Sequence, residues 1–169
     1  MRLDPNRLEK IARMLRELDG VTRIRDCADY PQHGDTSVLL HCAAVAYYAC
    51  TLLDALHVSY DERSLLRGAL LHDYFLYDWH HQQRAKGEGL HGFTHAATAL
   101  RNAKACVELT PTEENVIARH MFPLNLKPPA CREAWAVCLA DKYCALTETL
   151  CRNCYAEVRA MCRGILGVC

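Results

Sequence analysis

The sequence lacks an excess of charge of either sign, because twenty Lys and Arg residues balance twenty Asp and Glu residues. A chain without net charge offers no global field that would attract a nucleic-acid duplex or an anionic membrane, so we expect neither as a partner. Internal repeats and sustained alternation of apolar and polar residues are also lacking, which excludes a solenoid and a sheet-based fold. These absences favour an all-α protein.

A disulfide framework is lacking as well, although the chain contains eleven cysteines. Their number is odd, their spacing is irregular, and the first fifteen residues are charged and amphipathic rather than leader-like. We therefore expect free thiols and a cytoplasmic protein. Cys151 and Cys154 form one CxxC pair without a second pair at finger-like spacing, so we expect no structural zinc there. The Cys-rich helix near 151–162 fits either a dimer face or the core, which leaves a homo-oligomer open.

One apolar run, residues 38–56, is nearly long enough to span a bilayer. It contains His41 and Asp54, and no cluster of basic residues flanks it. A buried core helix fits this composition better than a membrane span.

Helix-start signals and breakers divide the chain into helices of one compact domain over residues 1–169. We expect an N-terminal helix at 4–19, a core at 35–150 and a C-terminal helix at about 152–165. Within the core, the pattern predicts helices over 37–56, 61–73, 91–107, 111–120 and 131–148. Thr110, Pro111 and Glu113 give a strong start signal, with a cap, an N1 proline and a Glu at N3. Residues 20–36, 78–90 and the Pro-rich stretch 121–130 are expected to be loops.

Several ionisable residues fall in or at the ends of these helices with apolar neighbours: His41, His72, Asp73, His91, His95, His120 and Asp141. Imidazole and carboxylate groups are preferred ligands of divalent transition metals. A single histidine on an apolar face is more often a satisfied core residue. That interpretation weakens here, because one packed domain would have to satisfy each of these groups separately. His33 and His57 have no supporting context, and His80 and His81 are expected to be solvated in a loop.

The ordered set His41, His72-Asp73, His95, His120, Asp141 resembles the HD-domain superfamily of metal-dependent phosphohydrolases. The resemblance covers roughly residues 35–150. The segments GALLHD at 68–73 and LADKY at 139–143 match the family closely, whereas the pattern from His95 to Ala99 and the segment IARH at 117–120 match it more loosely. The resemblance implies a helical bundle with a metal site in its core cleft.

In that family the first His, the HD pair and the last Asp hold one metal, which implies a site formed by His41, His72, Asp73 and Asp141. Members with two further histidines hold a second metal, with the Asp of the pair as the bridge.

By the same resemblance, His95 and His120 serve the second ion. His91 is a rival to His95, because the segment HGFTH places both on one helical face. We favour His95, since Ala96 and Ala99 stand where the family has small residues. The cofactor implied is a divalent transition metal, iron or manganese, with one or two ions per chain.

The resemblance further implies hydrolysis of a small-molecule phosphoester or nucleotide by a metal-activated water. Asp73 would also orient the nucleophile, and Lys142 and Arg119 are the sequence neighbours of ligands that could hold a phosphate. The loop 121–130 directly follows a ligand and is expected at the mouth of the site. The aromatic residues after the HD pair either wall a pocket or belong to the core.

One position departs from the family pattern, because Leu76 stands where many phosphohydrolase members carry a lysine. Two alternatives therefore remain at this stage. The same ligand set resembles di-iron oxygenases built on this fold. The chain also fits a non-catalytic module that binds a metal or nucleotide.

Overall fold

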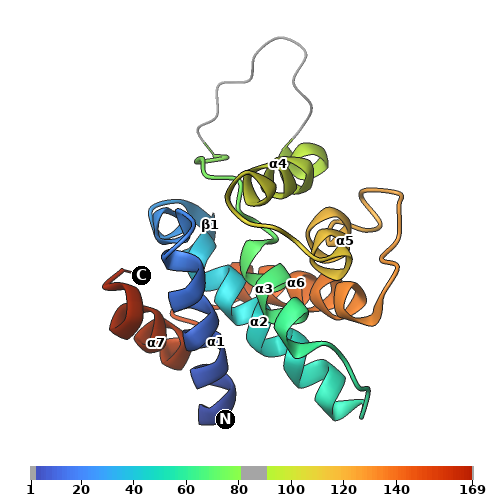
Figure 1. Cartoon of the computed structure of the whole chain (residues 1–169). Helices are drawn as coiled ribbons and strands as arrows, with labels where there is room; N and C mark the ends of the chain where they lie inside the picture. Colours follow the sequence, from blue (N-terminus) through green and yellow to red (C-terminus); the bar gives the residue numbers. More distant parts are fainter. Residues whose placement is uncertain (1–2, 81–90, 169) are drawn as a thin grey trace.

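The computed structural model describes residues 3–80 and 91–168, and over these residues it is a bundle of seven α-helices (Figure 1). The prediction of an all-α fold is confirmed. The helices are α1 (Pro5–Asp19), α2 (Val38–Ala55), α3 (Glu62–Leu71), α4 (His91–Cys106), α5 (Pro111–Arg119), α6 (Arg132–Leu150) and α7 (Ala156–Leu166).

Side-chain caps set the starts of several helices, as the sequence predicts. Ser37 accepts a hydrogen bond from the backbone N–H of Leu40 at the start of α2. Asp61 does the same for Ser64 at the start of α3. At α5, Thr110 and Glu113 form a complete capping box. Each cap contributes about 1 kcal/mol, so these residues fix where the ligand-bearing helices begin.

Helix α2 lies at the centre of the bundle, where it packs most extensively against α6 and α3. It is the one helix among the described residues that is long and apolar enough to cross a membrane by length and composition. In the structure, 72 % of that window is buried. Burial against α3 and α6 accounts for its apolar composition.

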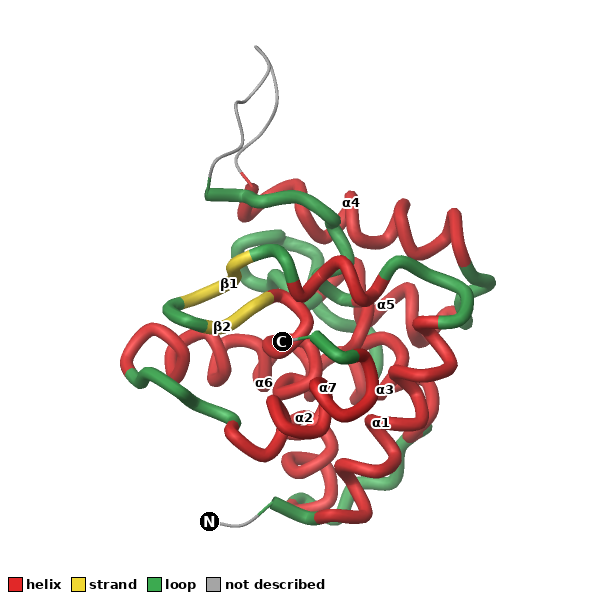
Figure 2. Tube along the Cα trace, turned by 90° about the vertical axis from the view of Figure 1, so that its left-hand side faces the viewer, coloured by secondary structure: helices red, strands yellow, loops and turns green. Residues whose placement is uncertain are grey.

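The predicted connection at 20–36 contains regular structure that the sequence did not reveal. A 3₁₀-helix (Ile24–Ala28) precedes a small antiparallel hairpin of β1 (Pro31–His33) and β2 (Thr36–Ser37), visible in Figure 2. Strands of three and two residues are too short to show alternation in a sequence. Helix α7 also begins later than predicted, because Asn153 and Tyr155 take left-handed conformations with φ of 53° and 64°.

Gly34 fits the hairpin closely against α6. Its φ is 58°, a conformation that side chains other than glycine rarely adopt. A Cβ atom at this position would lie 2.5 Å from the backbone oxygen of Glu148. The glycine therefore lets the hairpin rest on α6. This contact places the hairpin over the first turn of α2.

Candidate metal centre

Five different helices, or their ends, supply the ionisable residues predicted as metal ligands. His41 lies in the first turn of α2, His72 and Asp73 follow α3, and Asp141 lies in the middle of α6. His95 comes from α4 and His120 from the end of α5. All six side chains are buried, with exposed fractions between 0 % and 8 %. The structure thus brings together residues up to 100 positions apart.

One group of ligand atoms joins α2, α3 and α6. His41 Nε2 lies 3.1 Å from Asp141 Oδ1, and His72 Nε2 lies 3.8 Å from the same oxygen. Asp73 Oδ2 lies 3.6 Å from His72 Nε2 and 4.0 Å from His41 Nε2. Two imidazoles and two carboxylates therefore converge on one point, a donor set suited to a divalent transition metal.

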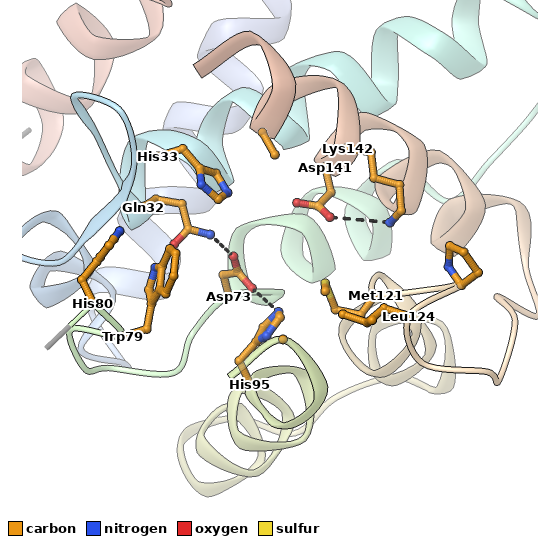
Figure 3. Close-up of a pocket in the computed structure, with 13 residues that line it drawn as sticks. Gln32, His33, Asp73, Trp79, His80, His95, Met121, Leu124, Asp141 and Lys142 are labelled. Atoms are coloured by element: carbon orange, nitrogen blue, oxygen red, sulfur yellow. Dashed lines mark hydrogen bonds and ion pairs between the residues drawn. The ribbon is translucent and has the colours of Figure 1, made fainter. Parts of the chain in front are cut away.

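A second group shares Asp73 with the first. Asp73 Oδ1 lies 3.3 Å from His95 Nε2 and 3.4 Å from His120 Nε2, and these two nitrogens are 2.9 Å apart. The carboxylate thus turns one oxygen to each group. Figure 3 shows Asp73 in this central position, with dashed lines to Gln32 and His95.

The far ring nitrogens of three histidines are fixed by hydrogen bonds. His41 Nδ1 lies 3.0 Å from both carboxylate oxygens of Glu148. His72 Nδ1 donates to the carbonyl of Ala69 at 2.7 Å, and His120 Nδ1 donates to that of Ile117 at 2.8 Å. When Nδ1 carries the proton, Nε2 presents its lone pair toward the centre. This arrangement is typical of metal-binding histidines.

Two atoms in the centre are buried without a hydrogen-bond partner among the described residues, His72 Nε2 and Asp73 Oδ1. A buried polar atom left unpaired costs about 1–3 kcal/mol, and such atoms are rare in folded proteins. A metal ion would satisfy both atoms, so the residues present fit a bound cation.

The electrostatics of the centre also favour a cation. Burial raises the pKa of Asp73, but the charges of His72 and His95 outweigh it and hold that pKa well below its usual range. Burial lowers the pKa of His41, whereas its hydrogen bonds with Asp141 and Glu148 outweigh burial and raise it to about 10. The Asp73 carboxylate thus remains ionised, and the negative charge beside His41 favours a positive charge at that position.

A model of the HD domain family matches residues 38–146. The chain belongs to the HD domain family. An HD domain is typically a metal-dependent phosphohydrolase, and together with the buried His and Asp groups it indicates a divalent metal site. A search of curated proteins and a search of solved structures both returned no match.

A cavity of about 740 Å³ opens onto the metal centre of this HD domain. Asp73, His95 and Asp141 lie at its inner end, with His33 and Trp79 on one side and Met121, Leu124 and Lys142 on the other (Figure 3). The prediction that the loop 121–130 forms part of the mouth is confirmed by Met121, Pro123 and Leu124.

Among the described residues that line this cavity, Lys142 carries the cationic side chain. Its ammonium group donates to the carbonyl of His120 at 2.8 Å and lies 3.8 Å from Asp141 Oδ2. Leu76 packs against the core and does not line the cavity. Arg119, at the end of α5, is not among the described residues that line the cavity either, so its role as a phosphate ligand stays a prediction.

The sequence did not reveal the role of three residues at this HD-domain centre, Gln32, His33 and Glu148. Gln32 donates from Nε2 to Asp73 Oδ2 at 2.6 Å, and the His33 ring meets the His41 ring edge-on at 5.8 Å. The expectation that His33 lacks a supporting context was therefore wrong, because the hairpin carries it over α2. Glu148 could have been found, since it lies seven residues after Asp141 and thus two turns along the same face of α6.

The other residues considered from the sequence lie in the core, at the wall of the cavity or outside the described part of the chain. Tyr74 and Phe75 are buried in the core, whereas Trp79 lines the cavity. His80 is exposed as expected, but it also lines the cavity and stacks on Trp79 with the ring centres 3.8 Å apart. The alternative ligand His91 begins α4, but its side chain lies outside the described residues, as does all of His81.

Proposed function

We propose that this protein hydrolyses a phosphomonoester or nucleotide with a metal-activated water. The proposal rests on Asp73, whose two carboxylate oxygens each face a different pair of imidazoles. A carboxylate in this position suits a bridge between two metal ions. Two-metal sites stabilise both the attacking and the leaving oxygen of a phosphoryl transfer.

The residues divide naturally between two ions. His41, His72, Asp73 and Asp141 would hold the first, while Asp73, His95 and His120 would hold the second. Bound metal supplies a water of lowered pKa and polarises the phosphoryl oxygens. Iron or manganese is our expectation, because imidazole ligands suit iron and carboxylate ligands suit manganese.

The chain's own groups hold the ligands and the substrate in position. Gln32 fixes the rotation of the Asp73 carboxylate through its hydrogen bond to Oδ2. Glu148 fixes the ring of His41. Lys142 holds its ammonium group at the cavity wall, where it can bind a phosphoryl oxygen and offset charge that develops during transfer. Lys142 thus supplies the positive charge that many family members place three residues after the HD pair.

The cavity and the cysteines support the remaining parts of the proposal. A volume of about 740 Å³ suits a small molecule of nucleotide size. Trp79 and His33 offer ring faces or edges that suit an aromatic base. We also propose a cytoplasmic location, in which the ten described cysteines, all free in the structure, would stay reduced.

Anaerobic purification followed by metal analysis and phosphate-release assays would test this proposal. We expect phosphate release from phosphomonoesters or nucleotides in the absence of O₂, and its loss in Asp73→Asn. Asp54→Asn is the matched control, because Asp54 is a surface carboxylate on α2 that pairs with Arg7.

Two other outcomes would replace the proposal. Consumption of O₂ with a mixed-valence iron signal would indicate the di-iron oxygenase alternative. Tight binding of a nucleotide without turnover of any phosphoester would indicate a non-catalytic module.

A further inference from the structure

The outer face of α6 carries large apolar side chains where a surface helix normally carries charge. Five of them are exposed by 40 % to 73 %: Trp135, Leu139, Tyr143, Leu146 and Leu150. Their spacing of four, four, three and four residues places them in one stripe along the helix, which we call the α6 stripe.

The inner face of α6 is buried as well, through residues such as Ala134, Val137 and Cys144. Apolar side chains thus occupy both the inner and the outer face of α6, as they do in helices that are covered on both faces. The described part of the chain leaves the α6 stripe largely exposed, although Tyr143 meets the ring of Tyr48 and Trp135 meets that of Phe122. Large exposed apolar patches of this kind mark interaction sites.

A groove runs beside the α6 stripe. It encloses about 430 Å³ between α2 and α6, and its lining includes Tyr48 and Leu52 from α2 and Leu139 and Tyr143 from α6. The groove and the stripe are both apolar, so the groove of one molecule can accept stripe side chains of a second molecule. Among the exposed residues of α6, the charged ones are Arg132 and Lys142, and Lys142 belongs to the wall of the metal-centre cavity.

We propose that the α6 stripe binds a second copy of this chain, forming a twofold-symmetric dimer in which the two α6 helices pack antiparallel. A twofold interface uses the same patch on both subunits, so the patch must complement itself. An uncharged stripe with three- and four-residue spacing meets this condition, because such spacing lets two helices interlock side chains. A partner with a charged surface would instead bury unpaired charge against it.

The available area approaches the size that a stable dimer needs. At the observed exposures each of the five side chains offers roughly 100 Å² of surface, so the stripe offers roughly 500 Å² per chain. The α2 side of the groove, with Tyr48 and Leu52, adds to this. Specific interfaces bury about 600–1,000 Å² per partner, which the stripe and the groove together approach.

From the sequence, the segment 151–162 fitted either a dimer face or the core. The structure favours the α6 stripe as the dimer face instead. In that segment Cys162 is buried in the core, and α7 packs its inner face against α1. The inference is independent of the proposed function, because none of the five stripe residues lies among the predicted ligands or the described lining of the metal-centre cavity.

Sedimentation velocity of the purified full chain would test the dimer. We expect a wild-type species of twice 19.1 kDa and a Leu146→Glu species of 19.1 kDa with unchanged helicity and metal content. Val21→Glu is the matched control, because Val21 is exposed to a similar extent, 58 % against 61 %, on the loop after α1. If Leu146→Glu fails to fold, Leu150→Lys serves instead, since a lysine in the last turn is compatible with the helix.

A second measurement locates the twofold axis. Tyr143 is the middle residue of the stripe, so in an antiparallel pair it lies next to its own counterpart. Tyr143→Cys should therefore form a disulfide-linked dimer on mild oxidation, whereas wild type and Val21→Cys should not.

Three results would overturn the proposal. They are a monomeric wild type at tens of micromolar protein, a Leu146→Glu variant that remains dimeric, and a Tyr143→Cys variant that links no better than Val21→Cys. Flotation of a monomeric wild type with phospholipid vesicles would assign the stripe to a membrane surface instead.

Discussion

Replacing Glu148 with glutamine tests whether the metal centre depends on a residue that would not itself touch the metal. Glu148 is 1 % exposed, and both its oxygens lie 3.0 Å from His41 Nδ1. Glutamine keeps the size of the side chain and can still accept one hydrogen bond from this nitrogen. It removes the negative charge that makes His41 more basic, and with it part of the strength of His41 as a ligand.

The expected cost follows from the behaviour of such partners of metal-binding histidines. Their loss lowers metal affinity about 10–100-fold, which corresponds to about 1.4–2.8 kcal/mol. Competition with a chelator of known affinity measures this change directly. The effect should appear in metal affinity even where the thermal midpoint changes little, because the hydrogen bond to His41 is retained.

Glu133→Gln provides the control on the same helix. Glu133 is also buried, at 6 % exposure, but it accepts a hydrogen bond from the backbone N–H of Asp61 at the start of α3. We expect this variant to lose stability without losing metal affinity. Equal metal affinity in wild type and Glu148→Gln would refute the reasoning, since the charge of Glu148 would then contribute nothing to the centre.

Three further predictions concern metal number, the hairpin and pH. His95→Ala and His120→Ala should each reduce the metal content from two ions to about one per chain, as measured by elemental analysis; unchanged content in both would exclude them as ligands. Gly34→Ala should destabilise the fold by about 1–3 kcal/mol in chemical denaturation, because a left-handed conformation and a contact with the Glu148 carbonyl oppose the added Cβ. Folding raises the pKa of His41 from 6.5 to about 10, so its protonated form stabilises the metal-free protein fully below pH 6.5 and progressively less as pH rises toward 10. The thermal midpoint of chelated protein should therefore fall across this range, and a midpoint that rises instead would contradict the assignment.

The helical framework was largely readable from the sequence because its signals are local. Asp61 and Thr110 cap their helices through contacts three residues away, so their effect does not depend on the rest of the chain. Likewise, the Pro-rich loop 121–130 reached the mouth as expected, because it directly follows His120.

The surroundings of the predicted ligands could not be read in the same way. Gln32 meets Asp73 only because a short hairpin rests on α6, a contact between segments more than 100 residues apart. No local pattern encodes that contact. The position of the Asp73 carboxylate between two pairs of imidazoles likewise depends on how α3, α4 and α5 pack. The periodicity of the sequence does not specify this packing.

The wide separation of these partners in the sequence has a consequence for synthesis on the ribosome. His41 is made early, whereas Asp141 and Glu148, which flank its ring in the finished protein, are made 100 and 107 residues later. Until α6 emerges, the nascent chain holds imidazoles and one carboxylate that have no complete set of partners. Contacts of such long range form late in folding, because loop closure must precede them. Metal capture is therefore expected to be among the last events in the maturation of this protein, after α6 has emerged and packed against α2.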